Sequence, residues 1–157
     1  MANLEETIAS SLSTRYLKMA GWVRELAAPL SEEQFWSKPF PFGNSFGNLV
    51  LHLTGNLSYY IGAQIAGTGY VRDRPREFNE ASWPPKEEVL KRFDDAVEMV
   101  VRTIRSQSAE NWSEAYSGTG ADAKTRLEMV LQSATHLHHH IGQMVYLGFE
   151  LKRTTSG

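Results

Sequence analysis

Residues 123–151, AKTRLEMVLQSATHLHHHIGQMVYLGFEL, form the stretch that decides the fold. Apolar residues recur in it at the three- and four-residue intervals of an α-helix. One side of this predicted helix carries a series of aliphatic residues: Leu127, Val130, Ala134, Leu137, Ile141 and Val145. A second apolar flank contains Met129, Met144 and Leu147. A helix that is apolar on two sides must be covered on two sides, so we expect it to lie in a helical core, with a partner subunit as one candidate for the second cover.

Three further long helices are predicted upstream, each with the same apolar periodicity. Their spans are residues 3–28, 45–65 and 86–106. Asn3, followed by Glu6 at the capping-box spacing, begins the first helix, and Ser45 caps the second. No segment outside these helices alternates polar and apolar residues as a half-buried strand would. The sequence therefore predicts an all-α protein, a four-helix bundle.

The connection between the second and third helices is about 20 residues long, at positions 66–85. A connection of that length can travel the length of a bundle, so these two helices are expected to run parallel, in up-down-down-up order. The charged run at residues 72–77 has balanced signs, and we interpret it as a solvated loop. The alternative is that it lines the mouth of a pocket and binds an anionic group of a substrate. At 157 residues, the chain (1–157) is expected to form one domain.

The composition excludes several classes of function. Lys and Arg number 16, Asp and Glu number 18, and the net charge of -2 removes the electrostatic argument for nucleic acid or an anionic membrane as a partner. The chain has no cysteine, which excludes disulfides, thiolate metal sites and a cysteine nucleophile. Acidic residues stand where a signal peptide would carry basic ones, so we expect a cytoplasmic protein.

Residues 39–71 contain no Asp, Glu, Lys or Arg and are largely apolar. Several glycines and the polar residues Asn48, His52, Asn56 and Gln64 argue against a membrane span, because such side chains are costly in hydrocarbon. We expect instead a helix enclosed by protein on most of its circumference.

The histidines occur at two places, one in the middle of the second predicted helix and four in the last: His52, then His136, His138, His139 and His140. His136 and His140 are one helical turn apart and share a flank, with Gln143 a further turn along. His138 points almost the opposite way, and His139 lies nearer a polar stripe.

This distribution is typical of a metal site. Two histidines at i and i+4 can hold one divalent ion, with a third ligand from another helix. His52 is the candidate for that third ligand, and it lies in a polar line on its own helix. Three neutral imidazoles leave the ion an open position, where the pKa of a water or a substrate atom can be lowered. The predicted metal ligands and the residues expected around them are His52, His136 and His140, then Asn48, Asn56, Tyr59 and Gln143.

Two interpretations without a metal compete with this one. A buried histidine is more often a satisfied core residue than a ligand, and a run of three histidines can be a solvated surface feature. Neither explains why all the histidines lie at one mid-helix position and one cluster.

Two motifs resemble those of the DinB/YfiT-like metalloenzymes. That family carries a histidine in a G-N-L-x-x-H-L pattern on its second helix, and residues 47–53 read GNLVLHL. It carries H-x-x-x-H-x-G-Q on its last helix, and residues 136–143 read HLHHHIGQ. The family's three ligands map onto His52, His136 and His140. Residues 73–78, DRPREF, resemble one uncharacterised DinB-like branch, and the likeness covers nearly the whole chain.

The resemblance implies an up-down-down-up bundle, commonly a homodimer, with a bound zinc, nickel or similar divalent ion. Some members of the family resemble transferases that attach low-molecular-weight thiols to electrophiles, and others resemble hydrolases or isomerases. The family name implies no DNA binding.

Two functions remain open at the level of sequence. The first is a metal-dependent enzyme, thiol S-transferase-like or hydrolase-like, that acts on a small-molecule substrate. The second is a non-catalytic dimeric bundle that binds a metal or a small ligand. No carboxylate is evident near the three histidines, so the catalytic residues stay unassigned and the second function stays open.

Overall fold

The computed structural model describes residues 3–155, and within them the fold is all-α, as the sequence predicts. The long helices are α1 (Leu4–Ala27), α3 (Phe46–Leu57), α5 (Lys86–Arg105) and α7 (Arg126–Thr155). A π-helix, η1 (Ser58–Ala63), continues α3, and three short helices complete the chain: α2 (Glu32–Trp36), α4 (Arg74–Asn79) and α6 (Ala109–Ser113).

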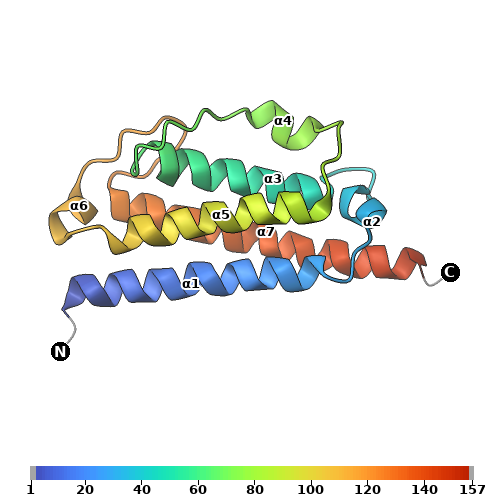
Figure 1. Cartoon of the computed structure of the whole chain (residues 1–157), viewed down its shortest axis with the longest axis horizontal. Helices are drawn as coiled ribbons and strands as arrows, with labels where there is room; N and C mark the ends of the chain where they lie inside the picture. Colours follow the sequence, from blue (N-terminus) through green and yellow to red (C-terminus); the bar gives the residue numbers. More distant parts are fainter. Residues whose placement is uncertain (1–2, 156–157) are drawn as a thin grey trace.

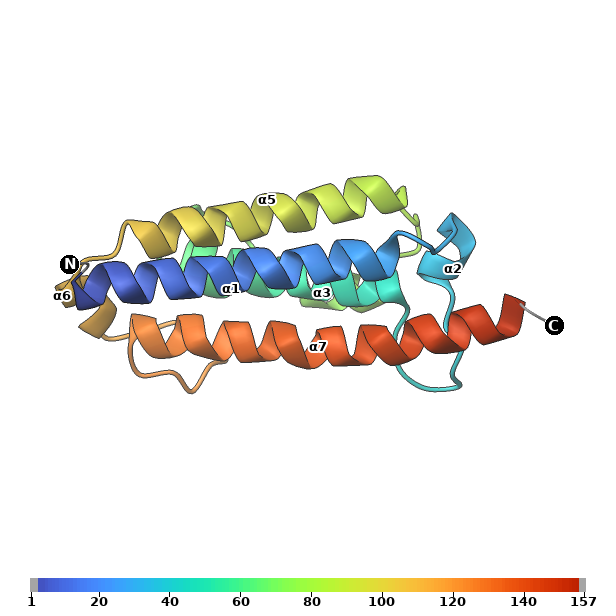
Figure 2. The same cartoon turned by 90° about the horizontal axis from the view of Figure 1, so that it is seen from below.

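The four long helices lie side by side, with α1 and α7 running in one direction and α3 and α5 in the other (Figures 1 and 2). Helix α1 packs against α5 and α7, and α3 packs against the same two helices. The connection from η1 to α5 runs back along the outside of α3 (Figure 1). Helix α4 is part of this connection and packs against α3. This arrangement makes neighbours of α3 and α7, the two helices that carry the histidines.

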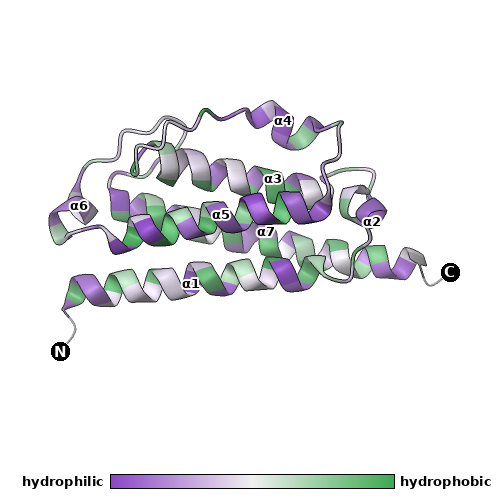
Figure 3. Cartoon of the chain, viewed as in Figure 1, coloured by the Kyte–Doolittle hydropathy of each residue, from purple (hydrophilic) through white to green (hydrophobic). Residues whose placement is uncertain are grey.

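The core lies between the long helices. Polar and apolar residues alternate along α5 (Figure 3), as expected for a helix with one buried side. Helix α3 differs, because all its residues except Leu51 and Thr54 are buried. This agrees with the expectation of a helix enclosed by protein on most of its circumference. Among the described residues, no helix combines the length and hydropathy that a membrane crossing requires.

The predicted helix starts are confirmed. Asn3 and Ser45 cap α1 and α3, each in a reciprocal capping box in which the cap side chain accepts from a backbone N–H three residues on. Ser45 is paired in this way with Asn48, so the residue that begins α3 also fixes the first turn of the histidine-bearing helix.

Two segments differ from the prediction. The helix predicted over residues 45–65 is α-helical only to Leu57 and then becomes η1. The interpretation of residues 72–77 as a solvated loop is correct for the exposure of residues 73–76 and wrong for the loop, because most of the run belongs to α4. Asp73 caps α4 by accepting from the backbone N–H of Arg76, Pro75 stands in its first turn, and Glu77 is buried.

Candidate metal centre

The structure brings His52, His136 and His140 together between α3 and α7. The Nε2 atom of His136 lies 3.2 Å from Nε2 of His52 and 3.1 Å from Nε2 of His140. One nitrogen from each ring can be chosen so that all three lie within 4.8 Å of one another. Residues 84 positions apart in the chain thus present imidazole nitrogens to a single point.

These distances fit a metal ion. Two nitrogens bound to one zinc ion at about 2.0–2.1 Å in tetrahedral geometry lie ~3.3 Å apart. The three rings also meet nearly edge to face, at interplanar angles of 69°, 82° and 85°, so their lone pairs can converge without the rings stacking. The donor set therefore suits a divalent ion such as zinc, and it leaves a fourth position free.

His52 is oriented by a carboxylate. Its Nδ1 atom lies 2.9 Å from Oε2 of Glu77, and both side chains are buried. An Nδ1–H that donates to this carboxylate leaves the lone pair of Nε2 free to bind an ion. Such a carboxylate–histidine pair is the usual support of a histidine ligand, because it fixes the tautomer and raises the basicity of the ring.

Arg72 balances the charge of Glu77. Its Nε and a terminal nitrogen donate to the two carboxylate oxygens at 2.6 and 2.9 Å. Burial by itself raises the pKa of Glu77, but the hydrogen bonds from His52 and Arg72 outweigh it and lower the pKa below its ordinary value. Glu77 is therefore ionised at neutral pH and acts as a fixed hydrogen-bond acceptor.

Two residues of α3 place Glu77 where it can reach His52. The side-chain amide of Asn48 donates to the backbone carbonyl of Glu77 at 3.1 Å, which holds α4 against α3. Gly55 lies directly under the carboxylate: a Cβ atom there would overlap Oε1 of Glu77 and approach its Cδ to 2.8 Å. Because Gly55 has no side chain, the carboxylate of Glu77 can lie directly against α3.

The two histidines of α7 are supported unequally. Nδ1 of His140 lies 2.7 Å from Oε1 of Gln143, an acceptor that again leaves Nε2 free. Nδ1 of His136 is buried and has no hydrogen-bond partner among the described residues. Burial, followed by the neighbouring His140 and His52, lowers the pKa of His136 to about 4, and burial also lowers the pKa of His140. Both rings are therefore neutral at pH 7, the state that a ligand requires.

A pocket of about 440 Å³ opens beside the site. His52 and His136 form part of its wall, so two of the three converging rings face it. The other walls come from α3, η1, the segment before α4, α4 itself, the segment before α7, and α7; among their residues are Asn56, Tyr60, Arg72, Arg74 and Gln132.

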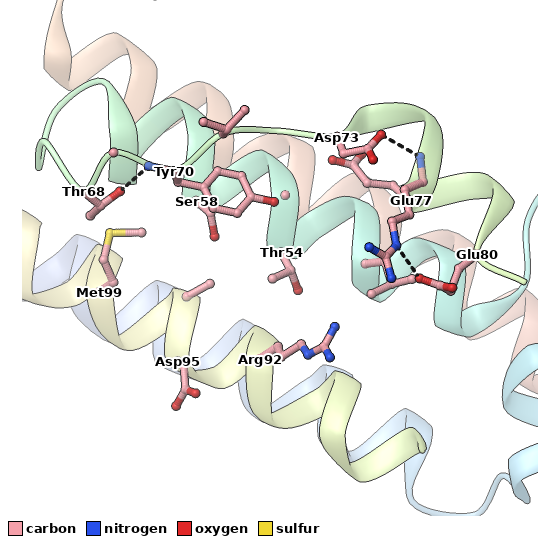
Figure 4. Close-up of a pocket in the computed structure, with 16 residues that line it drawn as sticks. Thr54, Ser58, Thr68, Tyr70, Asp73, Glu77, Glu80, Arg92, Asp95 and Met99 are labelled. Carbon is pink, nitrogen blue, oxygen red and sulfur yellow. Dashed lines mark hydrogen bonds and ion pairs between the residues drawn. The ribbon is translucent and has the colours of Figure 1, made fainter. Parts of the chain in front are cut away.

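A larger cavity, of about 800 Å³, lies on the far side of Glu77, between α3, α4 and α5 (Figure 4). In this view Thr54 and Ser58 lie opposite Asp95 and Met99 of α5. Several of its charged groups form ion pairs, among them Arg76 with Glu80 at 2.9 Å and Asp95 with Lys91 at 2.8 Å. No histidine lines it, and we assign it no chemistry.

The remaining residues predicted around the site fall in different places. Asn56 lines the smaller pocket, and Gln143 contacts His140. Asn48 does not touch the histidines and acts through Glu77. Tyr59 does not line this pocket, because its hydroxyl pairs with Thr119 at 3.0 Å; the next residue, Tyr60, lines it instead. Outside the triad, the ring of His138 lies against Trp22 of α1, 5.9 Å between centroids.

The sequence-based prediction of the site did not include Glu77 or Arg72. Both lie in the charged run whose balanced signs suggested exposure, 25 and 20 residues after His52. A usable signal was present in the DRPREF stretch, where Asp73 and Pro75 have the spacing of a helix start. A short helix there turns one of its glutamates towards α3.

Comparison with known proteins agrees with these features. The profile of the DinB superfamily matches residues 19–144, a span that includes both histidine motifs and α4. A comparison with curated proteins found no match. The match covers most of the chain, and the three histidines suited to a metal ion lie within it, so the chain belongs to the DinB superfamily.

Proposed function

We propose that this protein is a divalent-metal-dependent enzyme that acts on a small molecule, with His52, His136 and His140 as the metal ligands. The observation that carries the proposal is the convergence of the Nε2 atoms of His52, His136 and His140, 3.1 and 3.2 Å apart in two pairs, beside a pocket. Zinc and nickel are among the divalent ions that imidazole ligands suit, and we propose one of these two. When bound, the ion would supply Lewis-acid chemistry and lower the pKa of a water molecule or a small thiol.

The residues of the chain favour thiol transfer over hydrolysis. Hydrolysis of an ester or amide needs a general base or acid within hydrogen-bond reach, which passes the proton of the metal-activated water to the leaving group. No Asp or Glu lines the pocket within the described part of the chain, and both oxygens of Glu77 are already occupied by His52 and Arg72. A low-molecular-weight thiol needs no such base, because lowering its pKa is sufficient to make it a nucleophile. We therefore place a thiol S-transferase first and a hydrolase second.

Metal titration tests the ligand set. Purified, tag-free protein stripped with a chelator should bind one zinc ion per chain, measured by competition with a chromophoric chelator. His52→Ala and His140→Ala should each weaken binding by at least 100-fold, because each removes one of three ligands. His138→Ala is the matched control: it lies on the same helix, its ring contacts Trp22 instead, and it should bind zinc as the wild type does. Wild-type affinity in both ligand variants would overturn the proposal.

An activity screen separates the enzyme from a non-catalytic binding protein. Zinc- and nickel-loaded protein would be assayed with small thiols paired with electrophiles, and with simple esters and amides. Turnover with thiols that is lost in His52→Ala would support the transferase. Full zinc binding without turnover in any assay would favour the second function, a dimeric bundle that binds a metal or a ligand.

The architecture and assembly belong to the same proposal. The directions of α1, α3, α5 and α7 support the up-down-down-up four-helix bundle, and we propose one domain over residues 1–157. A homodimer is supported by exposed aromatic residues on α7, where Tyr146 is 74% and Phe149 65% exposed. The net charge of -2 supports a small-molecule ligand over nucleic acid or a membrane.

A further inference from the structure

The pocket beside the three histidines has charge of one sign. Arg72 and Arg74 line it, and no Asp or Glu does so among the residues that the structure describes. The larger cavity differs, because its lining mixes both signs: Asp73, Glu77, Glu80, Arg76 and Arg92. A concave site that presents cations alone concentrates anions.

The two arginines of the pocket differ in whether a carboxylate pairs with their charge. Arg72 forms a bidentate pair with the carboxylate of Glu77, so its charge is neutralised inside the protein. Arg74 makes no ion pair with any residue in the described part of the chain. Its guanidinium instead lies over the ring of Phe78 at 5.6 Å, and Phe78 in turn lies 5.0 Å from the ring of His52. Arg74 is thus an unbalanced cation held next to the site by an aromatic ring.

A second observation concerns unpaired acceptors in the same pocket. The Oδ1 atom of Asn56 and the Oε1 atom of Gln132 are buried and have no hydrogen-bond partner within residues 3–155. Asn56 is only 7% exposed, so bulk water does not satisfy it freely. Buried polar atoms without partners are uncommon in folded proteins. Both residues line the pocket, so a rotation of either side-chain amide would turn its oxygen towards a ligand that donates a hydrogen bond.

We infer that the pocket takes a small molecule with one carboxylate, which Arg74 binds, and with a hydroxyl or amide that faces Asn56 and Gln132. One unbalanced guanidinium matches one carboxylate in charge and in its two-pronged geometry, whereas a phosphate dianion would call for further cations. A volume of about 440 Å³ admits a molecule of metabolite size. The inference rests on the proposed function in one respect, that the reacting group of this molecule lies at the three histidines.

Paired probes test the inference in zinc-loaded protein by calorimetry. The probes are 3-mercaptopropionate and its neutral amide, which differ only in the charge of the group far from the thiol. We expect the acid to bind about tenfold more tightly than the amide in the wild type. Arg74→Gln should abolish this difference. Arg76→Gln is the matched control, because Arg76 lies on the same helix but pairs with Glu80 beside the larger cavity, and it should keep the difference.

Equal affinities for acid and amide in the wild type, or a preference that survives in Arg74→Gln, would overturn the inference. Tighter binding of 2-mercaptoethylphosphonate than of the carboxylate would overturn the assignment of a carboxylate. Zinc content, measured on the same samples, reports on the proposed function separately. Butyrate and butyramide, compared by NMR in metal-free protein, test Arg74 without the metal: a preference for butyrate that disappears in Arg74→Gln supports the inference, and no preference contradicts it.

Discussion

Glu77 is the single residue on which the geometry of the site most depends. Burying a carboxylate is costly unless it is paired and hydrogen-bonded, and Glu77 meets both conditions through Arg72 and His52. The contact with Nδ1 of His52 gives the buried carboxylate a role, because it holds the ring in the tautomer that a metal ligand needs.

Glu77→Gln tests this role. The amide keeps an acceptor for His52 but loses the charge, and it leaves Arg72 buried without a counter-charge. Zinc affinity, measured by chelator competition, should fall about 10- to 100-fold, the usual cost of losing an outer partner of a histidine ligand. Circular dichroism should show the helical content of the wild type.

Glu80→Gln provides the comparison, since Glu80 pairs with Arg76 and does not contact a histidine. It should bind zinc as the wild type does. If Glu77→Gln and Glu80→Gln bind zinc with equal affinity, Glu77 has no part in positioning His52.

At the residue scale, helical spacing alone predicts that His136 and His140 share a flank, and the structure places His52 beside them. It did not reach Glu77, because that contact depends on a short helix in a long connection. No periodicity in six residues predicts which side such a helix turns inwards.

Helices α3 and α4 act together as the frame of the site. Asn48 holds α4 by its backbone, and Gly55 lets the carboxylate of Glu77 lie against α3. The π-helix η1 then directs Tyr60 to the loop before α7, where its hydroxyl donates to the carbonyl of Gly120 at 3.0 Å and closes one wall of the pocket. π-helical turns often occur at functional sites, and this one adjoins the pocket.

Gly55→Ala tests the contact between these helices. An added Cβ would displace the carboxylate of Glu77, so zinc affinity should fall about tenfold even though no ligand has changed. The control is Gly21→Ala in α1, where a Cβ has no neighbour within 4 Å. That change should raise the free energy of unfolding by about 1 kcal/mol, the usual gain from replacing a helical glycine, and leave zinc affinity unchanged.

Unfolding in urea and chelator competition measure both quantities. Unchanged zinc affinity in Gly55→Ala would show that α3 and the carboxylate do not need this close approach.

The long helices were predictable because three- and four-residue periodicity and capping residues are local signals. The π-helix and α4 were not, since η1 differs from an α-helix by one hydrogen-bond register and α4 is stabilised largely by its contact with α3. The balanced charges of residues 72–77 suggested a solvated loop, but Glu77 and Arg72 form a buried ion pair with each other.

At the scale of the whole molecule, protonation of His136 links the candidate metal site to the free energy of unfolding. The pKa of His136 is lowered to about 4 from an ordinary value near 6.5, so the metal-free folded protein resists protonation at this ring while the unfolded chain does not. Between these two pH values the unfolded state binds more protons, and stability therefore falls as the pH falls.

The free energy of unfolding of metal-free protein, measured in urea, should thus decrease from pH 6.5 to about pH 4. The share due to His136 is at most ~3 kcal/mol. His136→Gln should have a flatter profile over this range, and His138→Gln should follow the wild type. Parallel profiles for the wild type and His136→Gln would contradict the lowered pKa.

X-ray absorption at the zinc edge of the loaded protein tests the central claim most directly. We expect the scattering of three imidazole rings with nitrogens at about 2.0–2.1 Å, together with one further light atom. His52→Ala, if it retains any zinc, should show two imidazoles. A spectrum with no imidazole scattering, or one that is the same in the wild type and in His52→Ala, would contradict a zinc ion held by these three histidines.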